Sequence, residues 1–282
     1  MSPLRIASLG SSFAAGPGIP PVIDTKAARS GANYAHLLYA RLGGAILTDL
    51  TVSGATLRNI LDEPQVEDGG RTVFAPQIEG LPTDTEVVLI LGGGNDAKYI
   101  GGVFMDSFDA YWLFRIATRV YRWFYPLAPE PSERELDMEA LAALYGEVLD
   151  AVHARAPNAR VLVVEYLTVL GDDVRPGFVD VPFDGRLLAR HRGTAEKLQM
   201  ATVKAVQGRE EWCVRVPVAE PSAAHGIGAE RPWVSGWGWR LLLAKGAYHP
   251  NAEGMVAVAE MIYQKMLGLG MTAGDRAATM DD

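Results

Sequence analysis

Short runs of aliphatic residues recur along the chain and alternate with stretches that have helical periodicity. Aliphatic runs of this length, bounded by glycine, proline or polar residues, are typical of strands that are buried on both faces. The sequence therefore predicts five buried strands, at residues 4–9, 45–52, 86–91, 160–167 and 213–218.

Two of the other stretches have the apolar spacing of an amphipathic helix. The first spans residues 138–154 and is closed by Pro157, and the second follows Pro250. The apolar stripe of the first consists of Leu141, Leu144, Val148 and Val152, and that of the second of Met255, Val258, Ala259, Ile262 and Met266. Strands that alternate with helices favour a parallel sheet covered on both sides, which is a doubly wound, three-layer α/β/α fold.

We expect one domain over residues 1–271, because the chain has no internal repeat and no low-complexity linker. Residues 99–131 form a longer segment than a crossover connection between two parallel strands needs. They are expected to form an aromatic-rich insertion near the functional site. Residues 272–282 are small and polar without periodicity, which predicts a mobile tail.

The most unusual residues follow the first three predicted strands, at residues 10–18, 53–55 and 92–96. Because ligands bind beyond the carboxyl ends of parallel strands, these segments should converge on one crevice. The first segment holds Ser12 in a glycine-bounded turn, where a serine hydroxyl could be exposed as a nucleophile. Taken alone, the turn is equally compatible with a phosphate-binding or purely structural role.

His249 is the candidate for the base that would activate this serine. Pro250 follows it and favours an extended backbone just ahead of the last predicted helix, so the imidazole should face the same edge of the sheet. Histidine is the side chain best suited to accept a proton near neutral pH. The alternative is that His249 only caps the helix. His36 and His153 lie within helical patterns and are expected to be surface or structural residues.

Two other residues could stabilise an oxyanion. Gly54 could offer an unobstructed backbone N–H and Asn95 a side-chain amide, to which the N–H of Ser12 would add a third donor. The glycines at 92–94 could instead form a flexible strand end, although a run of glycines before Asn95 is also what close approach to a ligand requires.

These four residues occur in blocks that resemble the SGNH (GDSL-like) hydrolase family. Ser12 stands in a GDS-like block, Gly54 in VSGAT, Asn95 in GGND and His249 in YHPN, all within residues 8–254. The resemblance implies a flavodoxin-like sheet, hydrolysis of carboxylic esters through an acyl-enzyme, and no metal or organic cofactor.

Two positions depart from the family's pattern. Ser11 stands where the family usually has aspartate, next to the nucleophile, and is a candidate substrate-binding residue. Gly246 occupies the place three residues before the histidine where the family's third triad member, an acid, normally lies. We expect the Gly246 backbone carbonyl to accept a hydrogen bond from Nδ1 of His249 instead, which would hold the tautomer but stabilise imidazolium less than a carboxylate does.

Aromatic residues cluster in two regions that could shape a pocket. Trp233 and Trp237 lie in a glycine-rich stretch before His249 and could wall a pocket for an acyl chain or a sugar face, unless they are buried only for stability. The aromatic residues of 104–125 are expected to pack mainly in the core rather than to form an acyl-binding lid.

Composition favours a small molecule as the partner, and the family resemblance implies that this molecule is an ester. The formal charge of −8 gives no basic footprint for nucleic acid, and no apolar stretch is long enough to span a membrane. Cys213 is the single cysteine, and no signal peptide of ordinary layout is visible, so cytoplasmic residence is expected. Three alternatives stay open at this point: an acyltransferase with the same site, a non-catalytic small-molecule-binding protein on this fold, and a nucleotide binder, although the chain lacks GxGxxG and a P-loop lysine.

Overall fold

A computed structural model describes residues 3–110, 136–177, 180–238 and 245–271. Its centre is a parallel sheet of five strands: β1 (Arg5–Gly10), β4 (Ile46–Asp49), β7 (Val87–Leu91), β8 (Arg160–Val164) and β9 (Cys213–Val216). Their order across the sheet is β4-β1-β7-β8-β9, which is 2-1-3-4-5 in chain order and therefore the flavodoxin-like arrangement. The five predicted strands and the predicted fold class are confirmed.

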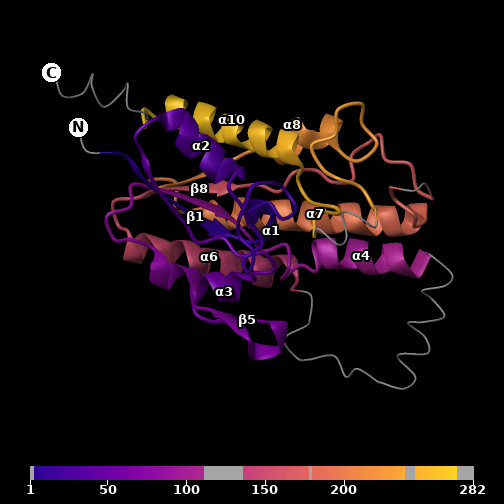
Figure 1. The fold of residues 1–282 in the computed structure, drawn as a ribbon, viewed down its shortest axis with the longest axis horizontal. Helices are drawn as coiled ribbons and strands as arrows, with labels where there is room; N and C mark the ends of the chain where they lie inside the picture. Colours follow the sequence, from indigo (N-terminus) through magenta and orange to yellow (C-terminus); the bar gives the residue numbers. More distant parts are fainter. Residues whose placement is uncertain (1–2, 111–135, 178–179, 239–244, 272–282) are drawn as a thin grey trace.

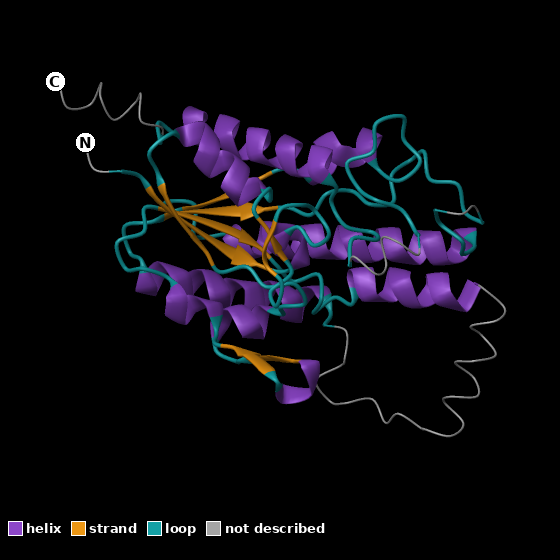
Figure 2. Ribbon diagram, viewed as in Figure 1, coloured by secondary structure: helices purple, strands orange, loops and turns teal. Residues whose placement is uncertain are grey.

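Helices cover both faces of this sheet (Figure 1). One layer contains α2 (Tyr34–Leu42) and α10 (Ala252–Gly268), which pack against each other. The opposite layer contains α3 (Leu57–Leu61), α6 (Met138–Arg155) and α7 (Gly185–Val206), and α4 (Tyr99–Ala110) packs on α7. The sheet is thus shielded from water on both sides, as the aliphatic strands require (Figure 2).

The two predicted helices correspond to α6 and α10. Asp137 caps α6 by accepting the N–H of Ala140, and Asn251 caps α10 by accepting the N–H of Gly254. These side-chain caps satisfy backbone donors that a helix leaves unpaired at its first turn. Since Asn251 is the cap, His249 lies in the loop directly before the helix, as expected.

Smaller elements complete the fold. They are the short helices α1 (Ser12–Ala15) and α8 (Ala219–Ser222), the 3₁₀ turns η1 (Asp68–Gly70), η2 (Gln77–Gly80) and η4 (Ala223–His225), and the antiparallel ribbons β2 (Val22–Asp24) with β3 (Arg29–Ser30) and β5 (Gln65–Glu67) with β6 (Thr72–Phe74). One cluster of buried hydrophobic side chains includes residues from Leu4 to Met266. The boundaries of the single domain expected over residues 1–271 remain a prediction. The expected tail at 272–282 and residues 111–131 of the expected insertion lie outside the described residues.

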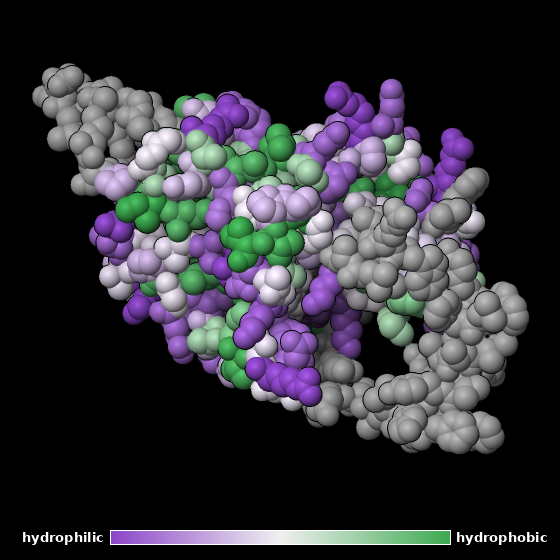
Figure 3. Space-filling model, viewed as in Figure 1, coloured by the Kyte–Doolittle hydropathy of each residue, from purple (hydrophilic) through white to green (hydrophobic). Residues whose placement is uncertain are grey.

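The outer surface mixes residue types. On the face shown in Figure 3, hydrophobic and hydrophilic residues are interspersed, and Val66 and Val73 of the β5–β6 ribbon are among the exposed hydrophobic residues. Among the helices that the structure describes, none has the length and apolar character needed to cross a membrane.

Candidate active site

The carboxyl ends of β1, β4 and β7 lie at one edge of the sheet, and the loop before α10 reaches the same edge. A pocket of about 190 Å³ opens there, and all four residues expected to act together contribute to it: Ser12, Gly54, Asn95 and His249. Its other lining residues are Ser11, Phe13, Ser53, Gly94, Ile100, Gly101, Phe104 and Tyr166. The crevice expected from the strand-end rule is therefore present.

Ser12 and His249 form a direct hydrogen bond. Ser12 Oγ lies 2.8 Å from His249 Nε2, although the two residues are 237 positions apart in the chain. Both side chains are buried, with 8% and 6% of their surface exposed. The distance falls within the range that a nucleophile and its base need for proton transfer.

The loop that carries Ser12 is anchored to its surroundings by backbone groups. The N–H of Ser11 donates to the carbonyl of Leu91 at the end of β7 (3.0 Å). The buried side chain of Gln77 both accepts the N–H of Gly10 (2.7 Å) and donates to its carbonyl (3.0 Å). These contacts fix the start of α1, and hence the position of the Ser12 hydroxyl, relative to the sheet.

The carbonyl that faces His249 Nδ1 belongs to Ala247, at 2.7 Å, and not to Gly246. The expectation for Gly246 was wrong because its carbonyl accepts the backbone N–H of His249 instead (3.3 Å). A backbone carbonyl does lie against Nδ1, as predicted, but it is the carbonyl of Ala247, the residue after Gly246. With the proton on Nδ1, Nε2 is left as an acceptor for the Ser12 hydroxyl.

Tyr248 provides the turn that presents this carbonyl. Its φ of +59° lies in the left-handed region, which costs a tyrosine about 1 kcal/mol or more. Surrounding contacts hold it there: its hydroxyl lies 2.6 Å from Ser107 Oγ on α4, and its N–H donates to the carbonyl of Ser235. The N–H of Ser235 in turn donates to the carbonyl of His249, so the loop is clamped on both sides.

The environment of His249 keeps the imidazole neutral. Burial lowers its pKa to about 4, against a smaller opposing effect of the Ala247 carbonyl. Within the described residues no carboxylate is hydrogen-bonded to the ring. A neutral imidazole at neutral pH can accept a proton. Among the described residues, the Ala247 carbonyl dipole is the group hydrogen-bonded to Nδ1 that could stabilise an imidazolium there.

Three hydrogen-bond donors surround the pocket beside Ser12. Within the described residues the N–H groups of Ser12 and Gly54 donate to no protein acceptor, which leaves them available to a ligand. Gly54 has a φ of +89°, a conformation that other residues adopt only with strain. Asn95 Nδ2 donates one hydrogen to the carbonyl of Ala55 (2.8 Å), which orients the amide and leaves its second hydrogen for the pocket.

Asp96 joins the loops that carry Gly54 and Asn95. Its carboxyl accepts the N–H of Leu57 at the start of α3, with Oδ2 at 3.0 Å. Burial raises the pKa of this carboxyl to about 6, against the opposing effect of the Leu57 N–H. Asp96 was not singled out from the sequence, although its place in the GGND block was a signal that could have identified it.

The expected substrate-binding residues behave differently from one another. Ser11 lines the pocket, and its hydroxyl lies 3.1 Å from that of Tyr166. Trp237 and Trp233 are not among the residues that line it, which favours the alternative that they are buried for stability. Trp237 is buried against Phe108, with ring centroids 4.9 Å apart, and Trp233 stacks on His225 at 3.8 Å. Trp237 also packs edge-on against Phe104, which lines the pocket, so it supports the pocket wall from behind without lining it.

Among its described residues, the aromatic segment contributes the ring of Phe104 to the pocket. Phe104 of α4 lines it, whereas Phe108 packs in the core with Trp237. Residues 111–125 of this segment lie outside the described part of the chain. The expectation that it serves mainly as core packing therefore holds for Phe108, while Phe104 faces both the core and the site.

The histidines expected to be structural lie in other parts of the fold. His36 on α2 approaches Asp49 (3.4 Å), and His153 on α6 stacks on Trp212. Across the described residues, no group of three or more His, Cys, Asp or Glu side chains is arranged to hold a metal ion.

Comparison with known proteins agrees with the fold. The model of the GDSL-like lipase/acylhydrolase family matches residues 8–257. The chain belongs to this family, and the protein is a carboxylic ester hydrolase.

The relatives include lipases of Streptomyces. The chain is 29% identical over 274 residues to Lipase 2 of Streptomyces coelicolor, covering 91% of this chain and 84% of that protein. The crystal structure of an extracellular lipase from Streptomyces rimosus aligns with a TM-score of 0.64 at 22% identity, covering 89% of this chain and 94% of that one. The structure of phospholipase A1 from Streptomyces albidoflavus NA297 aligns with a TM-score of 0.66 at 20% identity, covering 92% and 98%. At these identities the two structures establish the fold alone.

The raised pKa of Asp96 predicts how stability depends on pH. A carboxyl with a pKa near 6 in the folded chain and 3.8 in the unfolded chain binds its proton more tightly when folded. Its contribution to stability is therefore present at low pH and lost as pH rises through 6. Asp96→Asn does not titrate, so its free energy of unfolding relative to the wild type should increase between about pH 4 and about pH 7.

Urea denaturation of both proteins across this pH range measures the difference. The titration of His249 occurs in both proteins and cancels in the comparison. A difference that stays constant with pH would contradict the assignment.

Proposed function

We propose that this chain hydrolyses carboxylic esters through an acyl-enzyme, with Ser12 as the nucleophile and His249 as its general base. Ester hydrolysis follows from family membership, and the residue roles are the proposal. The observation that carries them is the 2.8 Å contact between Ser12 Oγ and His249 Nε2 in a buried pocket.

In the first half of the reaction, Ser12 Oγ attacks the ester carbonyl carbon while Nε2 of His249 accepts its proton. The carbonyl oxygen becomes an oxyanion, which accepts hydrogen bonds from the Ser12 N–H, the Gly54 N–H and the Asn95 amide. When the tetrahedral intermediate collapses, the ester C–O bond breaks and the leaving alcohol takes the proton from His249. The acyl group then remains on Ser12.

In the second half, water replaces the alcohol. His249 removes a proton from the water as it attacks the acyl carbon, and the same three donors bind the second oxyanion. Breakage of the bond to Ser12 Oγ releases the carboxylic acid, and the proton returns from His249 to the serine. An alcohol in place of water would give acyl transfer with the same groups.

The Ala247 carbonyl takes the place of the missing acid in orienting the ring. It accepts the Nδ1 hydrogen at 2.7 Å, which keeps Nε2 directed at Ser12 throughout the cycle. A carbonyl dipole stabilises the imidazolium less than a carboxylate, so we expect the base to be weaker than in a complete triad.

We propose a small-molecule ester with an apolar group beside the scissile bond as the substrate. Ile100, Phe104 and Phe13 provide apolar walls to the pocket beside the polar donors. The Streptomyces relatives described as a lipase and a phospholipase A1 support a substrate with an acyl chain.

Cytoplasmic residence stays a part of this proposal. The Streptomyces rimosus relative is described as an extracellular lipase, which is the reason to test it. Activity assayed separately in culture medium and cell extract of the native host distinguishes the two locations.

Replacing Ser12 tests the nucleophile directly. A fluorophosphonate should label the wild type covalently, and peptide mapping should locate the label on the peptide that contains Ser12. Ser12→Ala should lose the label, and its kcat for nitrophenyl esters should fall by at least about 10³-fold, because the attacking oxygen is gone.

Ser11→Ala is the matched control, because it removes the neighbouring hydroxyl. It should still be labelled at Ser12. Labelling that persists in Ser12→Ala, or that is abolished only in Ser11→Ala, contradicts the assignment.

The low pKa of His249 predicts an acid-tolerant pH profile. The base acts only when neutral, so kcat/KM for a nitrophenyl ester should rise with pH through a midpoint near 4. It should then stay level from about pH 5.5 to about pH 7. A complete triad would place this midpoint higher, since a carboxylate stabilises the imidazolium.

The carboxyl of Asp96 titrates near this range, and Asp96→Asn removes that titration. The midpoint near 4 should persist in this variant. A midpoint at about 6.5 or above in both proteins would show that the environment of His249 differs from the one described.

A further inference from the structure

The hydroxyl of Tyr166 lies where two loops of the site meet. Tyr166 follows the end of β8, and its Oη lies 3.1 Å from Ser11 Oγ and 2.9 Å from the backbone nitrogen of Gly94. Ser11 directly precedes Ser12, and Gly94 directly precedes Asn95. One side chain therefore connects the residue before the proposed nucleophile with the residue before a proposed oxyanion donor.

We propose that Tyr166 is a positioning residue that sets the spacing between Ser12 and Asn95, and thereby the geometry of the oxyanion hole. The proposal rests on the proposed function of those two residues. Oxyanion donors act only when they are held at hydrogen-bond distance from the developing charge, so the relative position of the loops that carry them bears directly on the rate.

The two hydrogen bonds are compatible with each other. The Gly94 N–H can only donate, so Tyr166 Oη accepts from it, and the phenolic hydrogen is free to be donated to Ser11 Oγ. Burial raises the pKa of Tyr166 to about 12, so the hydroxyl keeps this hydrogen across the range in which an esterase is assayed. The link is therefore present at every relevant pH.

Glycine at position 94 is explained by the approach of this hydroxyl. A Cβ at Gly94 would lie 2.6 Å from Tyr166 Oη, closer than real Cβ atoms come to any atom. Close approach to Tyr166 thus explains why residue 94 is a glycine. From the sequence, the glycines at 92–94 were interpreted as a flexible strand end or as a site of close approach to a ligand.

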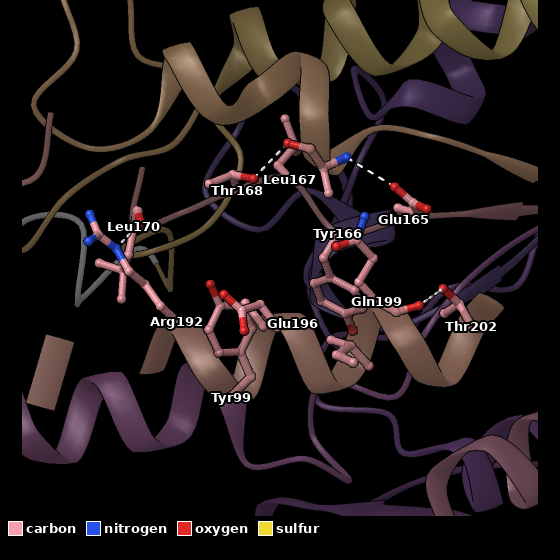
Figure 4. Close-up of a pocket in the computed structure, with 13 residues that line it drawn as sticks. Tyr99, Glu165, Tyr166, Leu167, Thr168, Leu170, Arg192, Glu196, Gln199 and Thr202 are labelled. Atoms are coloured by element: carbon pink, nitrogen blue, oxygen red, sulfur yellow. Dashed lines mark hydrogen bonds between the residues drawn. The ribbon is translucent and has the colours of Figure 1, made fainter. Parts of the chain in front are cut away.

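The Tyr166 ring lies between packed aromatic rings and a cavity. Its ring packs on Phe13 (centroids 4.7 Å apart), which in turn packs on His249 (5.3 Å). Tyr166 also lines a second cavity of about 190 Å³, between the loop after β8 and α7. Tyr99 lines the same cavity (Figure 4). The cavity borders the ring on one side, and the two hydroxyl contacts tie the ring to the two loops on the other.

Tyr166→Phe tests the proposal, because it keeps the ring and removes both hydrogen bonds. We expect kcat for a nitrophenyl ester to fall about 10- to 100-fold, since small displacements of catalytic groups have effects of this size. KM should change less than about threefold, because ground-state binding does not use the oxyanion hole.

Tyr99→Phe is the matched control. Tyr99 is also buried and its ring contacts that of Tyr166, but within the described residues no hydrogen bond joins its hydroxyl to either loop. Its kcat should stay within about twofold of the wild type.

A double-mutant cycle with Ser11→Ala gives a second, independent readout. Ser11→Ala alone removes one of the two hydrogen bonds and should lower kcat less than Tyr166→Phe does. Added to Tyr166→Phe, it should cost less than it does in the wild type, because its partner is already gone.

The outcomes separate this inference from the proposed function. A kcat of Tyr166→Phe equal to that of Tyr99→Phe, or effects of Ser11→Ala that are additive with Tyr166→Phe, would overturn the role of Tyr166 while the wild type remains active and labelled at Ser12. Loss of the nucleophile assignment would be seen instead in Ser12→Ala, whatever the Tyr166 variants do.

Discussion

A hydrogen bond between Ser12 Oγ and His249 Nε2, 2.8 Å long, joins the first loop of the fold to the last. It can form only because the strands are parallel, so that the loops after β1, β4 and β7 emerge at one edge, and because α10 begins beside that edge. Both partners are buried, which removes competing water and makes the contact sensitive to small displacements. The supporting contacts from Gln77, Leu91 and Ser235 all hold backbone segments that carry one of the two side chains.

Among the residues that the structure describes, no carboxylate is hydrogen-bonded to His249, and this bears on the chemistry proposed for the site. The ring is oriented by the Ala247 carbonyl, and this carbonyl is presented by a strained turn at Tyr248 that α4 stabilises through Ser107. Burial holds the pKa of His249 near 4, so the base that we propose would be neutral but weak. If His249 is such a weak base, the proposed oxyanion donors must supply more of the rate acceleration, which makes the proposed role of Tyr166 in setting their spacing more important.

The sequence predicted those features that depend on local pattern. Aliphatic runs identified the five strands, apolar stripes identified α6 and α10, and the blocks around Ser12, Gly54, Asn95 and His249 identified the four residues that meet in the pocket. Helix α7 was not predicted, because small or polar residues, among them His191, Ala201, Thr202 and Ala205, occupy much of its buried face in place of large aliphatic ones. Ala247 was missed because the direction of a carbonyl depends on the backbone turn, and a positive φ at a tyrosine has no signature in the sequence. Tyr166 lies at the end of the fourth predicted strand. The rule that sites form at the carboxyl ends of parallel strands, applied to this strand as well, would have made Tyr166 a candidate site residue. Its hydrogen bonds to Ser11 and Gly94 depend on tertiary contacts that the sequence does not reveal.

A crystal structure of the protein with a boronic acid tests the central claim most directly, because a tetrahedral boronate mimics the intermediate of ester hydrolysis. The boron should be bonded to Ser12 Oγ, with one boronate oxygen about 2.7–3.1 Å from the nitrogens of Ser12 and Gly54 and from Asn95 Nδ2. A second oxygen should lie within hydrogen-bond distance of His249 Nε2. Boron bonded to any other residue, or an oxygen that points away from these three donors, would contradict the account.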